Sequence, residues 1–175
     1  MKRQKPAGFT IVELLIVIVV IGILAAITIV AFNGIQQRAR NTQAVSGATA
    51  YHKAILQYAS LNSAYPTEDG CVGAGYPSNV CWKAAGSTAA SVNSALDTQL
   101  NPVLSSTSKP VLATSLLAFS VGPTNYERGG ARWIPSERRL VYYLQGVSQQ
   151  CSISTATAAN EGGVVTQCNI IYPVL

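Results

Sequence analysis

The sequence predicts an α+β protein in which one long N-terminal helix packs on a small antiparallel β-sheet domain. Three observations predict this class. An unbroken apolar run occupies residues 9–32, residues 36–61 repeat apolar side chains at helical spacing, and several segments after residue 112 have the composition of β-strands. The chain has 175 residues, which is enough for one modest domain with additional segments.

The apolar run is long enough to cross a membrane. Its length of about 24 residues gives roughly 36 Å of helix, and a bilayer core is about 30 Å thick, so the run spans it with some tilt. A cleaved secretory signal has an apolar region of only about 7–15 residues, so the run is too long for one. Lys2, Arg3 and Lys5 precede it, which places the leader in the cytoplasm and the rest of the chain outside.

Glu13 is the only ionisable side chain in this apolar run. A charged side chain at mid-span costs about 2.5–3.5 kcal/mol, and less near an interface. We therefore expect Glu13 to have a partner. The alternative is a carboxylate that is tolerated near the lipid headgroups.

The segment from Gly8 to Leu15 reads GFTIVELL, with the short basic leader before it and the apolar run after it. This combination resembles the class III signal of type IV prepilins and type II secretion pseudopilins. The resemblance is specific over residues 1–30, looser along the helix as far as Leu61, and general over the remainder. It implies the pilin fold, in which a long helix carries a head domain.

The resemblance also implies a role for three residues. A membrane prepilin peptidase would cut between Gly8 and Phe9 and N-methylate Phe9, and Glu13 would then pair with the new N-terminal ammonium of an incoming subunit. An unpaired carboxylate and an unpaired ammonium are both unfavourable in an apolar setting, so pairing them gives docking a register. Members of the family often have Pro where this chain has Val30. The helix bend that this Pro produces in the family is therefore not expected at Val30. We expect any loosening of the helix to start near Gly22 instead.

The resemblance, taken with the sequence patterns, predicts how the chain is divided. Residues 1–8 would be the cleaved leader, 9–32 the transmembrane and polymerisation half of the helix, 33–62 its amphipathic half, and 63–175 the head with two disulfide loops. The helix should end near Asn62, because Tyr65 precedes Pro66 and that position disfavours helix. Its buried stripe is predicted to comprise Ala44, Ala48, Tyr51, Ile55 and Tyr58.

Four cysteines indicate two disulfides and an oxidising compartment. Three pairings are possible, and we favour Cys71–Cys81 with Cys151–Cys168 because each closes one local loop. Zinc is not favoured, because there is no Cys-x-x-Cys and the single histidine is His52, within the helix. No cofactor or metal is therefore expected.

The head should contain a short helix and several strands. We predict the helix at Ser87–Leu100, and loops at Pro66–Gly86 and between Cys151 and Cys168. The predicted strands, which would form one small sheet, are Ala113–Val121, Ala131–Ile134, Arg139–Leu144 and Val164–Ile171. Glu68-Asp69 is the only acidic pair, and calcium, which takes about 6–8 oxygens, is not favoured there.

One basic cluster lies beyond the membrane segment. Arginines and aromatic residues together could contact DNA by charge and stacking, but Glu127 and Glu137 dilute the charge, and solvated arginines beside a strand are the commoner explanation. The cluster comprises Arg128, Arg132, Arg138 and Arg139 with Tyr126, Trp133, Tyr142 and Tyr143. The sequence has no catalytic motif, so we do not expect an enzyme.

The leading interpretation is a structural subunit of a type IV pilus. The alternatives are a pseudopilin of a type II secretion or DNA-uptake (competence) system and, from another class, a bitopic membrane protein with an extracellular binding domain. The expected partners are further copies of the chain, the prepilin peptidase, the assembly machinery and membrane lipid, with a nucleic acid least favoured. The precursor would lie in the inner membrane and the assembled fimbrium outside the cell. Adhesion, twitching motility and DNA uptake are not distinguished by the sequence.

Overall fold

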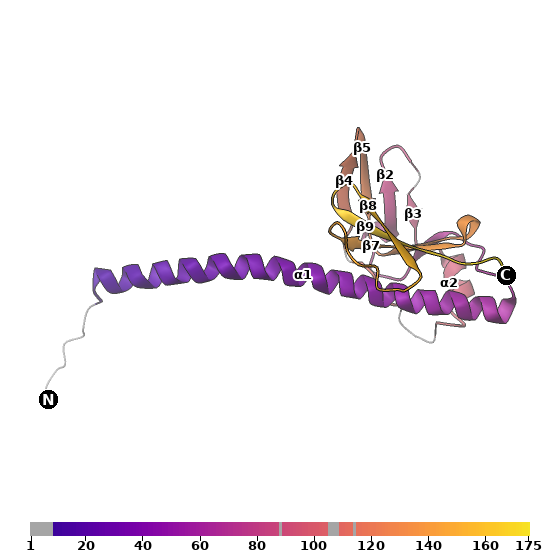
Figure 1. Cartoon of the computed structure of the whole chain (residues 1–175), viewed down its shortest axis with the longest axis horizontal. Helices are drawn as coiled ribbons and strands as arrows, with labels where there is room; N and C mark the ends of the chain where they lie inside the picture. The colour runs from indigo at the N-terminus through magenta and orange to yellow at the C-terminus, as the bar shows by residue number, and fades with distance from the viewer. Residues whose placement is uncertain (1–8, 88, 105–108, 114) are drawn as a thin grey trace, which may run out of the picture. The chain divides into compact units, whose positions relative to one another are not determined.

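A computed structural model describes residues 9–87, 89–104, 109–113 and 115–175. The chain divides into two compact units, Met1–Arg38 and Ala39–Leu175. The first helix, α1 (Ile11–Asn62), contributes residues to both units. The elements are labelled in Figure 1, and each unit is described by itself.

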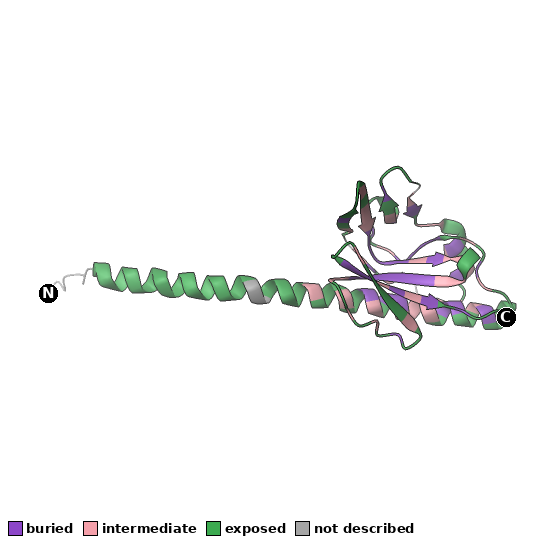
Figure 2. Ribbon diagram, turned by 45° about the horizontal axis from the view of Figure 1, so that its top comes forward, coloured by how far each residue is buried: buried purple, intermediate pink, exposed green. Residues whose placement is uncertain are grey.

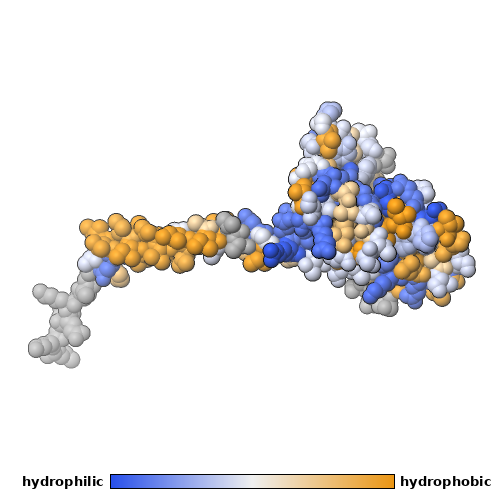
Figure 3. Space-filling model, in the orientation of Figure 1, coloured by the Kyte–Doolittle hydropathy of each residue, from blue (hydrophilic) through white to orange (hydrophobic). Residues whose placement is uncertain are grey.

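In the first unit, the described residues of α1 from Ile11 to Ile29 are all exposed, as the colour of this stretch in Figure 2 indicates. The apolar side chains between Ile11 and Ile29 retain exposures from 48% at Val20 to 86% at Ile11. Figure 3 shows apolar atoms along this part of the helix. A helix that is apolar all round needs apolar surroundings on every side. Between Ile11 and Ile29, the described chain leaves this apolar surface uncovered.

The apolar stretch contains one hydroxyl after Thr10, that of Thr28. Thr28 Oγ1 donates a hydrogen bond to the carbonyl oxygen of Ala25 at 2.9 Å. The hydroxyl is therefore satisfied within the helix, as a polar group in lipid must be.

Two antiparallel sheets make up most of the second unit. The five-stranded sheet has the order β1-β6-β7-β9-β8, and the four-stranded sheet has the order β3-β2-β5-β4. The strands are β1 (Gly70–Val72), β2 (Val80–Ala84), β3 (Ala90–Ser91), β4 (Leu117–Val121), β5 (Thr124–Arg128), β6 (Ala131–Ile134), β7 (Arg139–Gln145), β8 (Ala156–Glu161) and β9 (Val165–Ile171), and the short helices are α2 (Ser94–Leu100) and the 3-10 turns η1 (Pro77–Asn79) and η2 (Pro135–Glu137).

The main core lies between α1 and the five-stranded sheet. Four members of the predicted stripe, Ala44, Ala48, Tyr51 and Ile55, are buried, and Tyr58 is partly buried, so this prediction is confirmed. The sheet contributes its largest buried side chains to the same cluster: Trp133, Leu140, Tyr142, Leu144 and Ile170. Successive strand residues point to opposite faces, so the residues between these belong to the other face of the sheet.

Asn41 attaches α1 to the end of β7. Its Nδ2 donates to the carbonyl oxygen of Gln145 at 3.0 Å, and its Oδ1 accepts from the backbone N–H of Gln145 at 2.8 Å. The side-chain amide thus continues the backbone pairing of the strand where the sheet ends. Together with the packing of the main core, this contact holds this part of α1 against the sheet.

Arg128 joins the two sheets. It is only 4% exposed, and its Nε donates to Glu161 of β8 at 3.0 Å while its Nη1 donates to the carbonyl oxygen of Lys83 in β2 at 3.0 Å. The guanidinium lies 4.6 Å from the ring centre of Trp82 and 4.8 Å from that of Tyr126, close enough for cation–π attraction. The guanidinium also lies 5.6 Å from the ring centre of Phe119, which belongs to a second buried cluster with Val141, Tyr143 and Val165.

Both disulfides lie in the second unit. The structure pairs Cys71 with Cys81 and Cys151 with Cys168, which are the two pairings favoured from the sequence. Cys71, Cys81 and Cys168 are fully buried in the main core. Disulfides of this kind typically contribute about 2–4 kcal/mol each by restricting the unfolded chain.

The predicted fold class is confirmed, as are the end of α1 at Asn62 and the strand at Ala131–Ile134. The strands predicted at Arg139–Leu144 and Val164–Ile171 are present within one residue. The head differs in having two sheets where one was expected. The second sheet uses β5, which was not predicted, and β2, which lies within a predicted loop.

Other boundaries were wrong for local reasons. The helix predicted at Ser87–Leu100 begins only at Ser94, because Asn93 caps it by accepting from the backbone N–H of Ala95 at 2.9 Å, and the residues before it form β3. The strand predicted from Ala113 begins at Leu117; Thr114 lies outside the described residues. β8 occupies the predicted loop between Cys151 and Cys168.

Candidate functional site

The start of α1 is capped by three reciprocal hydrogen bonds between Thr10 and Glu13. Glu13 Oε2 accepts from the backbone N–H of Thr10 at 2.8 Å and from its hydroxyl at 2.7 Å. In return, the backbone N–H of Glu13 donates to Thr10 Oγ1 at 3.2 Å. This arrangement is a capping box, in which two backbone N–H groups that the helix leaves unpaired are satisfied by side chains.

The capping box gives Glu13 a partner within its own chain, which the sequence analysis did not anticipate. The signal was present as Thr-x-x-Glu at residues 10–13, directly before the apolar helix. Both recorded side-chain contacts use Oε2, and Glu13 remains exposed. The carboxylate can therefore hold the first turn and still present Oε1 to a second donor.

The other residues predicted for assembly lie beside this turn or along the helix. Phe9 precedes the capping box and is 85% exposed. Gly8 lies outside the described residues. Helix α1 continues through Val30, whose side chain is not among those described. A Cβ at Gly22 would meet nothing within 4 Å, so packing within the chain does not require glycine there.

Within the described residues, α1 is the one helix whose length and composition would let it cross a membrane. None of its most apolar stretch is buried inside the chain. Length and apolarity are also found in signal sequences and core helices. A core helix would be mostly buried, whereas this stretch is exposed, so it is not a core helix of the described chain.

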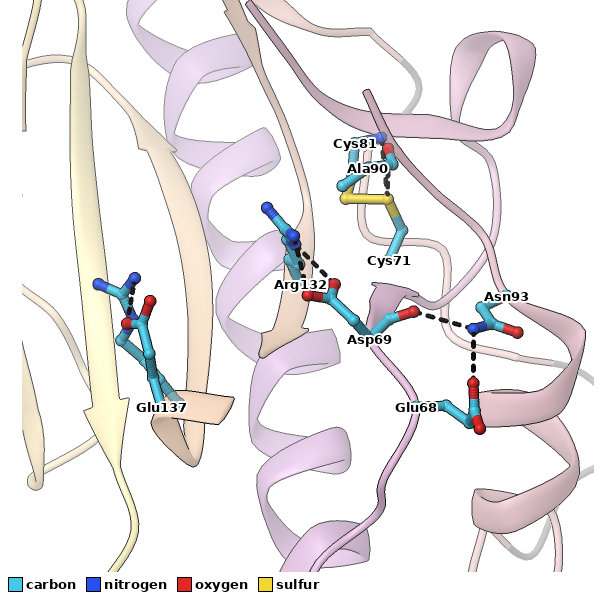
Figure 4. A network of polar contacts seen from close by, with 9 residues as sticks. Glu68, Asp69, Cys71, Cys81, Ala90, Asn93, Arg132 and Glu137 are labelled. Atoms are coloured by element: carbon cyan, nitrogen blue, oxygen red, sulfur yellow. Dashed lines mark hydrogen bonds and ion pairs between the residues drawn. A yellow bond between two sulfur atoms is a disulfide. The ribbon is translucent and has the colours of Figure 1, made fainter. Parts of the chain in front are cut away.

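The acidic pair in the head is engaged by protein partners (Figure 4). Asp69 accepts two hydrogen bonds from Arg132, at 2.8 Å to Nε and 2.8 Å to Nη2, and Glu68 lies 3.4 Å from Asn93 Nδ2. Across the described part of the chain, no group of three His, Cys, Asp or Glu side chains is arranged to hold a metal ion. The geometry therefore gives no support to a calcium site at this pair.

The structure distributes the predicted basic cluster over both sheets. Arg132 of β6 and Arg139 of β7 lie on the face of the five-stranded sheet opposite the main core, and Arg128 comes from β5 of the four-stranded sheet. Each of these three arginines forms an ion pair with a carboxylate. Trp133 and Tyr142 are fully buried on the face that packs against α1, so they are not available to stack on a base. Arg138 donates from Nε to the backbone carbonyl oxygen of Tyr172 at 3.3 Å. Because three of the four arginines are paired with carboxylates and three of the four aromatic rings are buried, the geometry does not favour nucleic-acid binding at this cluster.

His52 contacts the C-terminal segment rather than a metal. Its Nδ1 lies 2.7 Å from Tyr172 Oη, and the two ring centres are 5.5 Å apart. Burial raises the pKa of Tyr172, so the phenol stays protonated and donates to neutral His52. Burial also lowers the pKa of His52, because it disfavours the imidazolium.

This contact predicts an acid-sensitive head. An unfolded histidine titrates near pH 6.5, and the folded pKa of His52 lies lower, so below about pH 6.5 the unfolded chain binds the proton first and stability falls. We expect the Tm to drop between about pH 7.5 and pH 5.5, and to drop less in His52→Gln. Scanning calorimetry of both proteins at the two pH values measures this. An equal drop in both proteins would assign the acid sensitivity to other groups.

Comparison with known proteins connects these features to a family. A family model described as the prokaryotic N-terminal methylation motif matches residues 3–29. Type II secretion system core protein G of Klebsiella michiganensis is 38% identical over 69 residues, covering 39% of this chain and 49% of that protein. The protein of the same name in Vibrio cholerae is 37% identical over 68 residues, covering 39% and 47%. Fimbrial protein EcpC of Eikenella corrodens is 36% identical over 73 residues, covering 42% and 48%.

The methylation motif and the long helix followed by antiparallel sheets are the features of a pilin-like class of protein. Over its N-terminal part the chain resembles the type IV pilin and type II secretion pseudopilin superfamily. The matched region spans about half the length of these relatives. No solved structure matches the chain.

Proposed function

We propose that the chain is a structural subunit of a type IV pilus. In this proposal the precursor sits in the inner membrane with residues 1–8 in the cytoplasm and the head outside. The prepilin peptidase cuts between Gly8 and Phe9 and methylates Phe9. The mature subunit then leaves the membrane and joins an extracellular fibre of identical copies.

The observation that carries the proposal is the overlap of the methylation motif, at residues 3–29, with a helix that is apolar and exposed on all sides. Such a surface is stable in lipid before assembly. It is equally stable in a bundle of identical helices, because packed apolar helices replace lipid contacts of similar polarity. One segment can therefore serve as the membrane anchor of the precursor and as the polymerisation surface of the fibre.

Glu13 would act as the docking group of this surface. Its Oε2 holds the N–H and hydroxyl of Thr10 in the same chain, and Oε1 would receive the methylated ammonium of the incoming subunit's Phe9. Both ions would leave water in the fibre, and an isolated charge in apolar surroundings is strongly unfavourable. Subunits whose ammonium does not reach a carboxylate would therefore be disfavoured, which sets the register of assembly.

A second candidate function is a pseudopilin of a type II secretion or DNA-uptake system. Its support comes from relatives such as those in Klebsiella michiganensis and Vibrio cholerae, which are core proteins G of type II secretion systems. The chemistry at Phe9 and Glu13 would be the same in either assembly. A bitopic membrane protein with an extracellular binding domain is the alternative that needs no cleavage at all.

Cleavage gives the first test. In cells that contain the peptidase, we expect the mature chain to begin at N-methylated Phe9, because the cut precedes the anchor and leaves it intact. Mass spectrometry of the purified protein measures the N-terminus, and cells lacking the peptidase provide the uncut control. Chains that keep the leader in both strains would support the bitopic alternative. Sheared surface filaments that contain the protein would separate a pilus from a secretion pseudopilus.

A further inference from the structure

The face of the five-stranded sheet opposite the main core carries a polar hollow of about 490 Å³. Val141 and Tyr143 of β7 form part of its floor, and Trp82 of the four-stranded sheet lines its side. Small-molecule sites typically have volumes of about 300–1,000 Å³. We call this hollow the arginine groove, after Arg128, Arg132 and Arg139, which line it.

The arginine groove is electrically balanced. Arg128 pairs with Glu161 at 3.0 Å. Arg132 pairs with Asp69 at 2.8 Å, and Arg139 with Glu137 at 2.6 Å. All three carboxylates line the same hollow as the three guanidinium groups.

This balance argues against an anionic ligand. Binding of a polyanion depends on unpaired cations that neutralise its charges. In the groove an anion would have to displace carboxylates that already hold the arginines. The groove therefore favours a ligand without net charge.

The polar side chains that line the groove are also held in position. Arg139 Nη1 and Gln167 Nε2 both donate to Asn169 Oδ1, at 3.1 Å and 2.7 Å, and Arg132 makes two hydrogen bonds to Asp69. A guanidinium has five N–H donors, and a carboxylate is an acceptor only. The groove thus places donors and acceptors side by side. A hydroxyl group can use both, because it donates one hydrogen bond and accepts two.

An extended peptide fits this face less well. Peptides are commonly recognised by adding a strand to a sheet edge or by inserting side chains into pockets. The strands that form the groove floor, β6, β7 and β9, are internal strands of the sheet, so their backbone groups already pair with neighbouring strands. A ligand on this face has to be recognised by side chains alone.

A second hollow of about 450 Å³ adjoins the first and shares Asp69 and Arg132 with it. It is lined on its other side by Ser91, Asn93 and Ser94. Figure 4 shows the ion pair of Asp69 and Arg132 and, from the same loop, the contacts to Asn93. A linear ligand with repeated polar units could contact both hollows across this ion pair.

We propose that the arginine groove binds a neutral oligosaccharide. Such a ligand is uncharged, linear and rich in hydroxyl groups, and it matches the balanced charge, the fixed donors and acceptors, and the two adjoining hollows. The proposal rests on the second unit alone. It does not depend on whether the chain assembles into a pilus.

The test is direct binding to the full-length chain, kept in a detergent that has no sugar headgroup. Isothermal titration with cellohexaose, chitohexaose and maltohexaose at millimolar concentration supplies neutral probes, and a heparin hexasaccharide supplies a charged one. We expect at least one neutral probe to bind, with weak dependence on salt. Gln167→Ala should weaken that binding about tenfold, which corresponds to about 1.4 kcal/mol, because it removes a donor and acceptor from the groove.

A matched pair of serine variants locates the site. Ser136 is exposed and lines the groove, and Ser60 is exposed on α1 and does not line it. Ser136→Ala should weaken binding, and Ser60→Ala should leave it unchanged. The proposal is overturned if no neutral probe binds, if only heparin binds and does so with steep salt dependence, or if binding survives Gln167→Ala and Ser136→Ala in full. Near-UV circular dichroism of each variant distinguishes a local loss from misfolding.

Discussion

Glu13→Gln is expected to stop fibre growth while leaving the precursor folded and in the membrane. Glutamine is also accepted at this position of a capping box, so its side-chain oxygen can still hold Thr10. It carries no charge, so an incoming ammonium would enter the apolar bundle unpaired. Removing one partner of a buried ion pair costs about 3–5 kcal/mol. We therefore expect fibre yield to fall on the order of 100-fold or more.

The measurement compares sheared surface fibres with total precursor, both quantified by immunoblot. Thr10→Val supplies the matched control, because it removes the hydroxyl of the capping box and keeps the carboxylate of Glu13. Losing such a cap costs about 1 kcal/mol, so fibres should persist. Wild-type fibre levels in Glu13→Gln would refute the docking role. Equal losses in the two variants would assign the effect to helix capping.

The parts of the fold that were predictable have strong local periodicity or chemistry. The stripe from Ala44 to Ile55 repeats at helical spacing, and Arg139–Leu144 is rich in β-formers, so each identifies its element without reference to the rest of the chain. The disulfides are local too, since their cysteines are 10 and 17 residues apart. At the proposed assembly site, the motif predicts roles for Phe9 and Glu13, and these roles stay predictions. The capping box was also visible in the sequence but was not considered.

The strands that were missed lack such a signal. β1 has three residues, all buried, and β8 is an edge strand with its four central residues exposed, so neither shows an alternation of apolar and polar side chains. Arg128 was missed as a core residue for a different reason. Arginine is almost never fully buried unless it is paired. Its partner Glu161 is 33 residues away in the chain, and sequence spacing does not show that pairing.

The buried position of Arg128 leads to the largest stability change that we expect in the head. In Arg128→Met, the carboxylate of Glu161 loses its ion-pair partner, and the Trp82 and Tyr126 rings lose the cation between them. Breaking a buried pair costs about 3–5 kcal/mol. The Glu161 side chain is 27% exposed and can be partly solvated, so we expect the free energy of unfolding to fall by about 3 kcal/mol.

Urea unfolding of the full-length chain, followed by tryptophan fluorescence, measures this change, because Trp82 lies beside Arg128 and Trp133 lies in the main core. The control is Lys83→Met, which breaks an exposed ion pair with Glu127 at 3.7 Å on the same sheet and should cost under about 1 kcal/mol. Adding Glu161→Gln to Arg128→Met should recover part of the lost free energy of unfolding, because the second substitution removes the unpaired carboxylate. A loss no larger than that of Lys83→Met would mean that the two sheets are held together by the apolar cluster around Phe119 rather than by the ion pair.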